Sequence, residues 1–191
     1  MTVASHVTVF LAIIVALAVG DLATSFHRLM TARARVRWYW PVLVLAAFVL
    51  AMLLESYWVD FSIYSDERSL TIAAFFPDVM IRILVFLMAA AILPDSLPRG
   101  TVDLRGHYWM QARYFWSLML LAYAAIFLVF APRTTEQGVT VISFLEQWWG
   151  NILTMAAAAI MIFSRREWLH KLLILMIAAI AIDNFYGQAI G

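Results

Sequence analysis

The sequence contains no cysteine, and this absence removes several chemistries at once. Without thiols the chain cannot form disulfides, use a cysteine nucleophile, or bind iron–sulfur clusters or zinc through thiolates. Charged residues are also scarce, because Asp, Glu, Lys and Arg together make up 13% of the 191 residues. Since a soluble domain carries about 25% charged residues, the composition is untypical of a soluble protein.

Hydrophobic residues take the place of the missing charges. They make up 65% of the chain, against about 45–50% in a soluble domain, and the mean hydropathy is +0.88. This composition predicts an integral membrane protein. The formal net charge of +1 does not indicate a nucleic-acid partner, because in a membrane protein the position of each charge along the chain matters more than the sum.

Six apolar runs are long enough to cross about 30 Å of hydrocarbon, which takes roughly 20 helical residues. The alternation typical of barrel strands is absent, so helices are favoured. The first run is not a cleavable signal peptide, because it lacks a basic n-region and is followed by arginines. The sequence therefore predicts an all-α polytopic membrane protein, a single transmembrane domain of residues 1–191 with three helical hairpins, whose spans lie near 4–29, 40–58, 69–93, 110–131, 142–163 and 168–189.

The distribution of Lys and Arg predicts the orientation of these spans. Ten of the 13 basic residues lie in or beside the connections after the first, third and fifth spans, two lie on the opposite side, and Arg82 lies inside a span. Because cytoplasmic loops carry an excess of Lys and Arg, both termini are predicted to be outside. All eight tryptophans fall at the predicted membrane interfaces, which agrees with an aromatic belt.

Charged residues inside the predicted spans are the main candidates for function. A charge at the bilayer centre costs about 2.5–3.5 kcal/mol on insertion scales. Asp78 and Arg82 in "FFPDVMIRILVF" are four residues apart on one helix face, with the acid first, so one interpretation is mutual neutralisation during insertion. Four further acids have no other basic residue at their depth, so some must be protonated, reach water or bind a cation: Asp21, Glu55, Glu146 and Asp183.

Each of these acids also has a structural interpretation. Glu55 and Glu146 lie near the outer interface and could simply be solvated, and Glu146 could cap the start of its helix. Asp21 shares a helix face with Thr24 and Arg28, which could be either a polar route to the cytoplasm or a hydrogen-bonded helix–helix seam. Asp183 is deeper and adjoins an asparagine.

We expect the outer-half polar residues to converge on an acidic cavity that is open to the outside. Arg82 would lie at its floor and Asp21 below it, an arrangement that suits proton relay, cation passage or an anion held by the arginine. The predicted ion pathway therefore consists of Asp21, Glu55, Asp78, Arg82, Glu146, Asn151 and Asp183.

The four histidines are His6, His27, His107 and His170, and they show no HxxxH or HExxH spacing. Nucleotide-binding and nucleophile-elbow motifs are absent from the sequence as well. We therefore expect no catalytic residue, no metal and no cofactor, although a haem- or metal-dependent membrane enzyme stays open as the weakest alternative.

The stretch "VGDLATSFHRLMTARARVRWYW", followed by an apolar helix, resembles a group of small, uncharacterised multi-pass proteins of bacterial inner membranes. The similarity covers mainly the first hairpin and implies a bacterial inner membrane and no particular activity.

These observations favour an ion channel or an ion-coupled transporter for protons or cations. The alternative is a non-enzymatic accessory or scaffold subunit whose buried charges pair with a partner membrane subunit. Because much of a six-helix bundle would face the lipid bilayer, a pore is easier to form between copies, and we expect a homo-oligomer.

Overall fold

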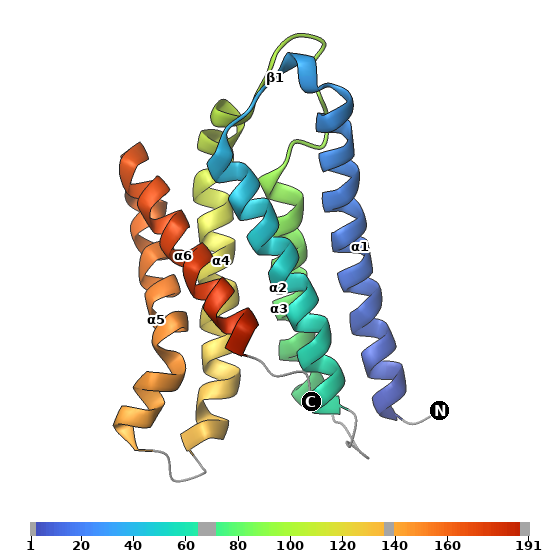
Figure 1. The fold of residues 1–191 in the computed structure, drawn as a ribbon. Coiled ribbons are helices and arrows are strands. Elements are labelled where there is room, and N and C mark those ends of the chain that lie inside the picture. Colours follow the sequence, from blue (N-terminus) through green and yellow to red (C-terminus); the bar gives the residue numbers. More distant parts are fainter. Residues whose placement is uncertain (1–2, 65–71, 136–139, 188–191) are drawn as a thin grey trace.

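The computed structural model describes the backbone of residues 3–64, 72–135 and 140–187, and the side chains of residues 6–58, 75–131 and 140–184. These residues form six α-helices and one two-stranded ladder, which confirms the predicted all-α class (Figure 1). The helices are α1 (Val3–Thr31), α2 (Trp40–Tyr64), α3 (Ile72–Ile92), α4 (Leu104–Thr135), α5 (Val141–Phe163) and α6 (Glu167–Gly187). The expected start of the third span at residue 69 and the expected end of the sixth at residue 189 lie outside the described residues.

The helices run alternately in opposite directions, so that both ends of the chain lie at one end of the bundle (Figure 1). The connections after α1, α3 and α5 lie at the other end, which we call the basic end (residues 32–39, 93–103 and 164–166). Helix α1 packs against α2 and α3, α3 packs against α4, and α4 packs against α5. Helix α6 runs obliquely across the bundle and packs chiefly against α2.

Within the residues whose side chains the structure describes, four helices are long and apolar enough to cross a membrane: His6–Thr31, Trp40–Trp58, Phe75–Ile92 and Leu104–Ala131. Their presence supports a membrane protein. Helices α5 and α6 are not among the four. Helix α5 gathers Glu146, Gln147 and Asn151 within two turns, and α6 carries charged residues at both ends. Six spans with a fixed topology therefore stay a prediction.

Helix α4 begins at Leu104, six residues earlier than the span predicted near 110–131. The reason is a cap that periodicity does not reveal. The Asp103 carboxylate accepts a hydrogen bond from the backbone N–H of Arg105 at 3.1 Å, which satisfies one of the free donors of the first turn. Gly106 permits this, since a Cβ there would lie 3.1 Å from Asp103 Oδ2.

The connections at the basic end are held to one another. Strands β1 (Val36–Arg37) and β2 (Val102–Asp103) pair in parallel, with Val36 opposite Val102. The Arg35 guanidinium donates to three successive carbonyls, those of Pro98, Arg99 and Gly100, at 3.1, 2.8 and 3.1 Å. Arg28 donates to the carbonyl of Asp95. Two arginines that mark orientation in the sequence therefore also fix the segment between α3 and α4.

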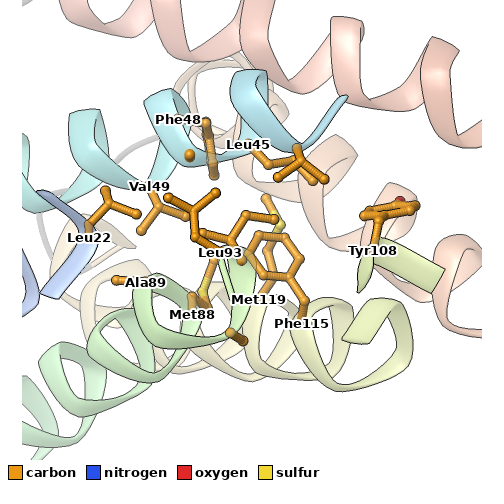
Figure 2. Close-up of a cluster of buried hydrophobic side chains, with 14 of the residues drawn as sticks. Leu22, Leu45, Phe48, Val49, Met88, Ala89, Leu93, Tyr108, Phe115 and Met119 are labelled. Atoms are coloured by element: carbon orange, nitrogen blue, oxygen red, sulfur yellow. The ribbon is translucent and has the colours of Figure 1, made fainter. Parts of the chain in front are cut away.

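The centre of the bundle is a layer of buried apolar side chains from α2, α3 and α4 (Figure 2). We call it the apolar layer: Leu45, Val49, Met88, Phe115 and Met119. Each of these five side chains is at most 2% exposed. On α2 and α4 the layer separates the polar residues near the basic end from those nearer the other end, so the bundle contains two polar clusters.

Candidate functional site

A small polar cavity lies between α2, α4, α5 and α6, on the side of the apolar layer away from the basic end. Its polar lining comes from one residue of each helix: Glu55, Tyr123, Asn151 and Asn184. The other lining residues are apolar or glycine, including Phe48 and Ile177. The volume of the cavity is ≈ 20 Å³. Because a cavity needs at least about 10–15 Å³ to hold a water, this one has room for a single water. We call this site the polar cavity.

Gly150 brings the helices together at this point. A Cβ on Gly150 would lie 2.9 Å from Ile180 Cγ2 and 3.9 Å from Asn184 Nδ2, so any larger residue would push α6 away from α5. The glycine therefore lets α6 approach closely where Asn151 and Asn184 meet. The sequence "WWGNILT" thus encodes a packing contact, and the polar side chain after the glycine lines the polar cavity.

Helix α3 presents a buried acid and a buried base beside α2. Asp78 is 4% exposed and Arg82 is 5% exposed. Arg82 Nη2 donates to the backbone carbonyl of Ser56 at 3.4 Å, so the guanidinium reaches α2 at the residue that follows Glu55. Burying a charge is costly unless it is paired or hydrogen-bonded, so the fold must supply polar partners for both groups.

The structure thus brings together part of the predicted pathway. Glu55 and Asn151 line the polar cavity, and Arg82 contacts the adjacent turn of α2. The predicted convergence is wrong for Glu146 and Asp183, which are exposed and do not line the cavity. The reason is helix phase: Asp183 points about 100° away from Asn184, and Glu146 about 140° away from Asn151. Asn184, and not Asp183, therefore lines the polar cavity.

Asp21 lies on α1, which contributes nothing to the polar cavity. It is half-buried, whereas Thr24 on the same face is exposed and turns its hydroxyl back to the Gly20 carbonyl at 2.7 Å. Arg28, one turn further, is bound to the Asp95 carbonyl. The stripe on α1 is therefore separate from the polar cavity and leads to the segment between α3 and α4.

Glu146 does not cap α5, because Thr140 does so: its Oγ1 accepts from the backbone N–H of Ser143 at 3.3 Å. Pro77 lies inside α3, and the helix continues through it.

Tyr123 was missed by the sequence analysis, although its position carries a signal. It lies seven residues after Trp116, which places both on the same face of α4. Carboxylates and amides suggested the predicted pathway, and tyrosine was not weighed with them, so the hydroxyl-bearing side chain that lines the polar cavity went unnoticed.

The second polar cluster lies near the basic end and is a closed chain of hydrogen bonds. Trp116 Nε1 donates to the Tyr108 hydroxyl at 3.1 Å, and that hydroxyl lies 2.5 Å from His170 Nδ1. His170 Nε2 lies 3.1 Å from the Ser164 carbonyl, which can only accept. Nε2 therefore carries a proton and donates to this carbonyl, and Nδ1 shares the second hydrogen bond of the ring with the Tyr108 hydroxyl. We call these three side chains the aromatic chain: Tyr108, Trp116 and His170.

An ionic cluster joins the same helices at the surface of the basic end. Glu167 forms ion pairs with Arg105 and with Lys171, whose Nζ lies 2.9 Å from Glu167 Oε1. Tyr39 donates to the same oxygen at 3.3 Å. The hydrogen bond from Lys171, assisted by Arg105, lowers the pKa of Glu167. Burial, with the Glu167 charge adding to it, raises the pKa of Tyr39 to about 12.

Both nitrogens of His170 are engaged in hydrogen bonds, and His107 Nε2 is bonded to the Ala91 carbonyl at 3.2 Å. Within residues 6–58, 75–131 and 140–184, no three His, Asp or Glu side chains gather as a metal site would require.

No family model matches the chain, and comparison with curated proteins and with solved structures found no significant match.

Proposed function

We propose that this chain is a six-span protein of the bacterial inner membrane, with both termini outside, that moves protons or small cations past Glu55. The observation that carries the proposal is the polar cavity, where a carboxylate, two amides and a phenol from four helices meet. Ionisable residues at membrane depth that face a cavity commonly mark ion or proton pathways.

The size of the polar cavity favours a small species. A volume of ≈ 20 Å³ holds one water and excludes an organic substrate. The donor set is also that of a hard cation, because carboxylate and amide oxygens are the ligands that such ions prefer. A proton carried by Glu55 and a water, or one small cation, would fit this lining.

The buried Arg82 gives the proposed site a means of control. Its positive charge, beside the turn of α2 that carries Glu55, would oppose the entry of a second cation. Asp78 on the same helix face would offset part of that charge.

The apolar layer supports a gated mechanism over a permanently open pore. Along α2 and α4, side chains with almost no exposure separate Glu55 and Tyr123 of the polar cavity from Tyr39 and Tyr108 near the basic end, and an ion could not cross this layer without movement. Helix α6 is the element best suited to move, because it packs chiefly on α2 and meets α5 closely at Gly150.

Flux in proteoliposomes tests the proposal directly. The purified chain should carry protons or monovalent cations across vesicles in response to an imposed gradient, and Glu55→Gln should lower that flux about tenfold or more, a change of about 1.4 kcal/mol in the barrier. Glu146→Gln is the matched control, since it removes the same charge from an exposed site, and it should conduct like the unmodified protein.

Equal flux in both variants would remove Glu55 from the pathway. A chain that gives no flux above empty vesicles and retains a second membrane protein in equal amount would instead be an accessory subunit. We propose that the working form is a homo-oligomer, which cross-linking of the same vesicles would reveal.

A further inference from the structure

A second cavity lies between α1 and α2 and differs from the polar cavity in every respect. Its volume is ≈ 490 Å³, and every lining side chain is apolar. Four lining residues come from each helix and one from the residue directly after α3: Val19, Leu22, Ala23, Phe26, Leu43, Ala46, Ala47, Leu50 and Leu93. We call this the apolar groove. Figure 1 shows that α1 and α2 diverge toward the basic end, where the groove lies.

The depth of the apolar groove matches a single leaflet. Trp38 and Trp40 are 41% and 39% exposed and mark the headgroup level, where aromatic belts lie. Leu43 lies about 4.5 Å below Trp40 along α2, and Leu50 lies about 15 Å below it. Because half of the hydrocarbon is about 15 Å thick, the groove begins just beneath the headgroups and ends near the midplane.

Two unused positive charges lie above the mouth of the groove. The connection between α1 and α2 is eight residues long and contains Arg33, Arg35 and Arg37. The Arg35 guanidinium is occupied by backbone carbonyls, but those of Arg33 and Arg37 are exposed and make no hydrogen bond or ion pair with any residue that the structure describes. Asp103, which lies opposite Arg37 in the strand pair, uses its carboxylate to cap α4.

We propose that the apolar groove binds an acyl chain of an anionic phospholipid from the leaflet at the basic end, and that Arg33 and Arg37 bind its phosphate. Basic residues beside a membrane attract anionic headgroups, and a lipid places its phosphate directly above its chain. A partner helix fits less well, because a helix that spans the bilayer would pack along both leaflets, whereas the groove covers one. The proposal does not depend on ion movement.

Lipid retention by the purified protein tests the headgroup contact. The protein in detergent is titrated with phosphatidylglycerol or with phosphatidylcholine of the same acyl chains, and bound lipid is counted by native mass spectrometry. Removing both charges in Arg33→Gln/Arg37→Gln should weaken phosphatidylglycerol binding about 30-fold, because each basic residue near an anionic surface contributes about fivefold. Binding of phosphatidylcholine should change less than twofold.

The matched control is Arg165→Gln/Arg166→Gln, which removes two exposed charges from another connection at the basic end. It should bind phosphatidylglycerol within twofold of the unmodified protein. An equal loss in this control would overturn the proposal, since it would mean that net charge alone attracts the lipid.

Filling the apolar groove tests the acyl-chain contact. Ala47→Phe should remove the bound phospholipid of either headgroup, whereas Ala156→Phe, an equal change on an exposed face of α5, should not. Circular dichroism on heating establishes that each variant is folded, and Ala47→Leu replaces Ala47→Phe if the latter is not. Undiminished lipid binding in the folded variant would overturn the proposal. So would a dimer that Ala47→Phe converts to a monomer without loss of lipid, because a second copy would then occupy the groove.

Discussion

The two polar clusters of this bundle each contain a tyrosine of α4 and yet differ in how their side chains are arranged. In the aromatic chain, one hydroxyl links an indole to an imidazole, and the other imidazole nitrogen reaches a carbonyl. None of its three side chains lines the polar cavity or the apolar groove. Across the apolar layer, Glu55, Tyr123, Asn151 and Asn184 surround a space large enough for one water. Polar side chains that bond to one another fix the helices that carry them. Polar side chains that leave a space between them can bind a water or an ion in that space.

The largest effect should come from breaking the buried charges beside the polar cavity. Arg82→Gln alone leaves the Asp78 carboxylate buried without its helix-face partner, and removing one member of a buried pair costs about 3–5 kcal/mol. Asp78→Asn alone should be similarly harmful. Unfolding of the detergent-solubilised protein by added dodecyl sulfate, followed by circular dichroism, measures the loss.

The double variant Asp78→Asn/Arg82→Gln separates structure from function. Replacing a whole buried pair is often neutral, so the folded yield should recover. Under the proposed function the folded double variant should still leak or fail to transport, because Arg82 would control what passes Glu55. Normal flux in the folded double variant would mean that the pair serves insertion alone.

The aromatic chain should respond in the opposite way, losing stability and keeping function. Tyr108→Phe removes the hydroxyl that serves both Trp116 and His170, and each buried polar group left without a partner costs about 1–3 kcal/mol. Flux per folded molecule should be unchanged. Tyr114→Phe on the exposed face of the same helix is the control and should lie within about 0.5 kcal/mol of the unmodified protein. Lost flux in folded Tyr108→Phe would make this cluster part of the pathway.

The contrast between the clusters also explains what the sequence could and could not predict. Apolar length and basic loops predicted six helices, and α2, α5 and α6 begin within one residue of the expected positions. The start of α4 was misplaced because it depends on a side-chain cap at Asp103. Such local hydrogen bonds are invisible to hydropathy.

The candidate site was predicted only in part, and the reason differs from that for the start of α4. Glu55 and Asn151 were expected to face one cavity, and both line the polar cavity. Asp183 and Glu146 were placed by depth alone, and depth does not give the side of the helix that faces the bundle. Tyr123 and the aromatic chain were missed because the role of such a side chain depends on its hydrogen-bond partners. Those partners depend in turn on which helices are in contact. A single sequence does not contain that information directly.

A smaller effect should follow from closing the polar cavity without changing any charge. In Gly150→Ala the new Cβ would approach Ile180 Cγ2 to 2.9 Å, and overpacking of this kind typically costs about 1–3 kcal/mol. The clash should push α5 and α6 apart at the polar cavity. Flux should therefore fall further than in Tyr108→Phe, although the loss of stability should be no larger than in that variant. Adding Ile180→Leu, which keeps the side-chain volume but has a single γ carbon and so can leave the Cγ2 position empty, should restore both flux and stability to Gly150→Ala. A restored stability with flux still lost would mean that Gly150 acts on the pathway by some means other than spacing.

The smallest effect concerns the ionic cluster at the surface of the basic end and depends on pH. The pKa of Glu167 is lowered in the folded protein, first by the hydrogen bond from Lys171, so its contribution to stability is present above the pKa of the unfolded chain. That contribution should be lost as the pH falls through the lower, folded pKa, when the carboxyl becomes protonated and releases Arg105 and Lys171. Because Arg105 is 60% exposed, the whole effect should be at most about 1 kcal/mol. Thermal unfolding of the unmodified protein and of Glu167→Gln should therefore differ slightly at pH 7 and converge as the pH falls below about 4, near and beneath the ordinary pKa of a glutamate. A difference that persists at low pH would mean that Glu167 acts through its hydrogen bond with Tyr39 rather than through its charge.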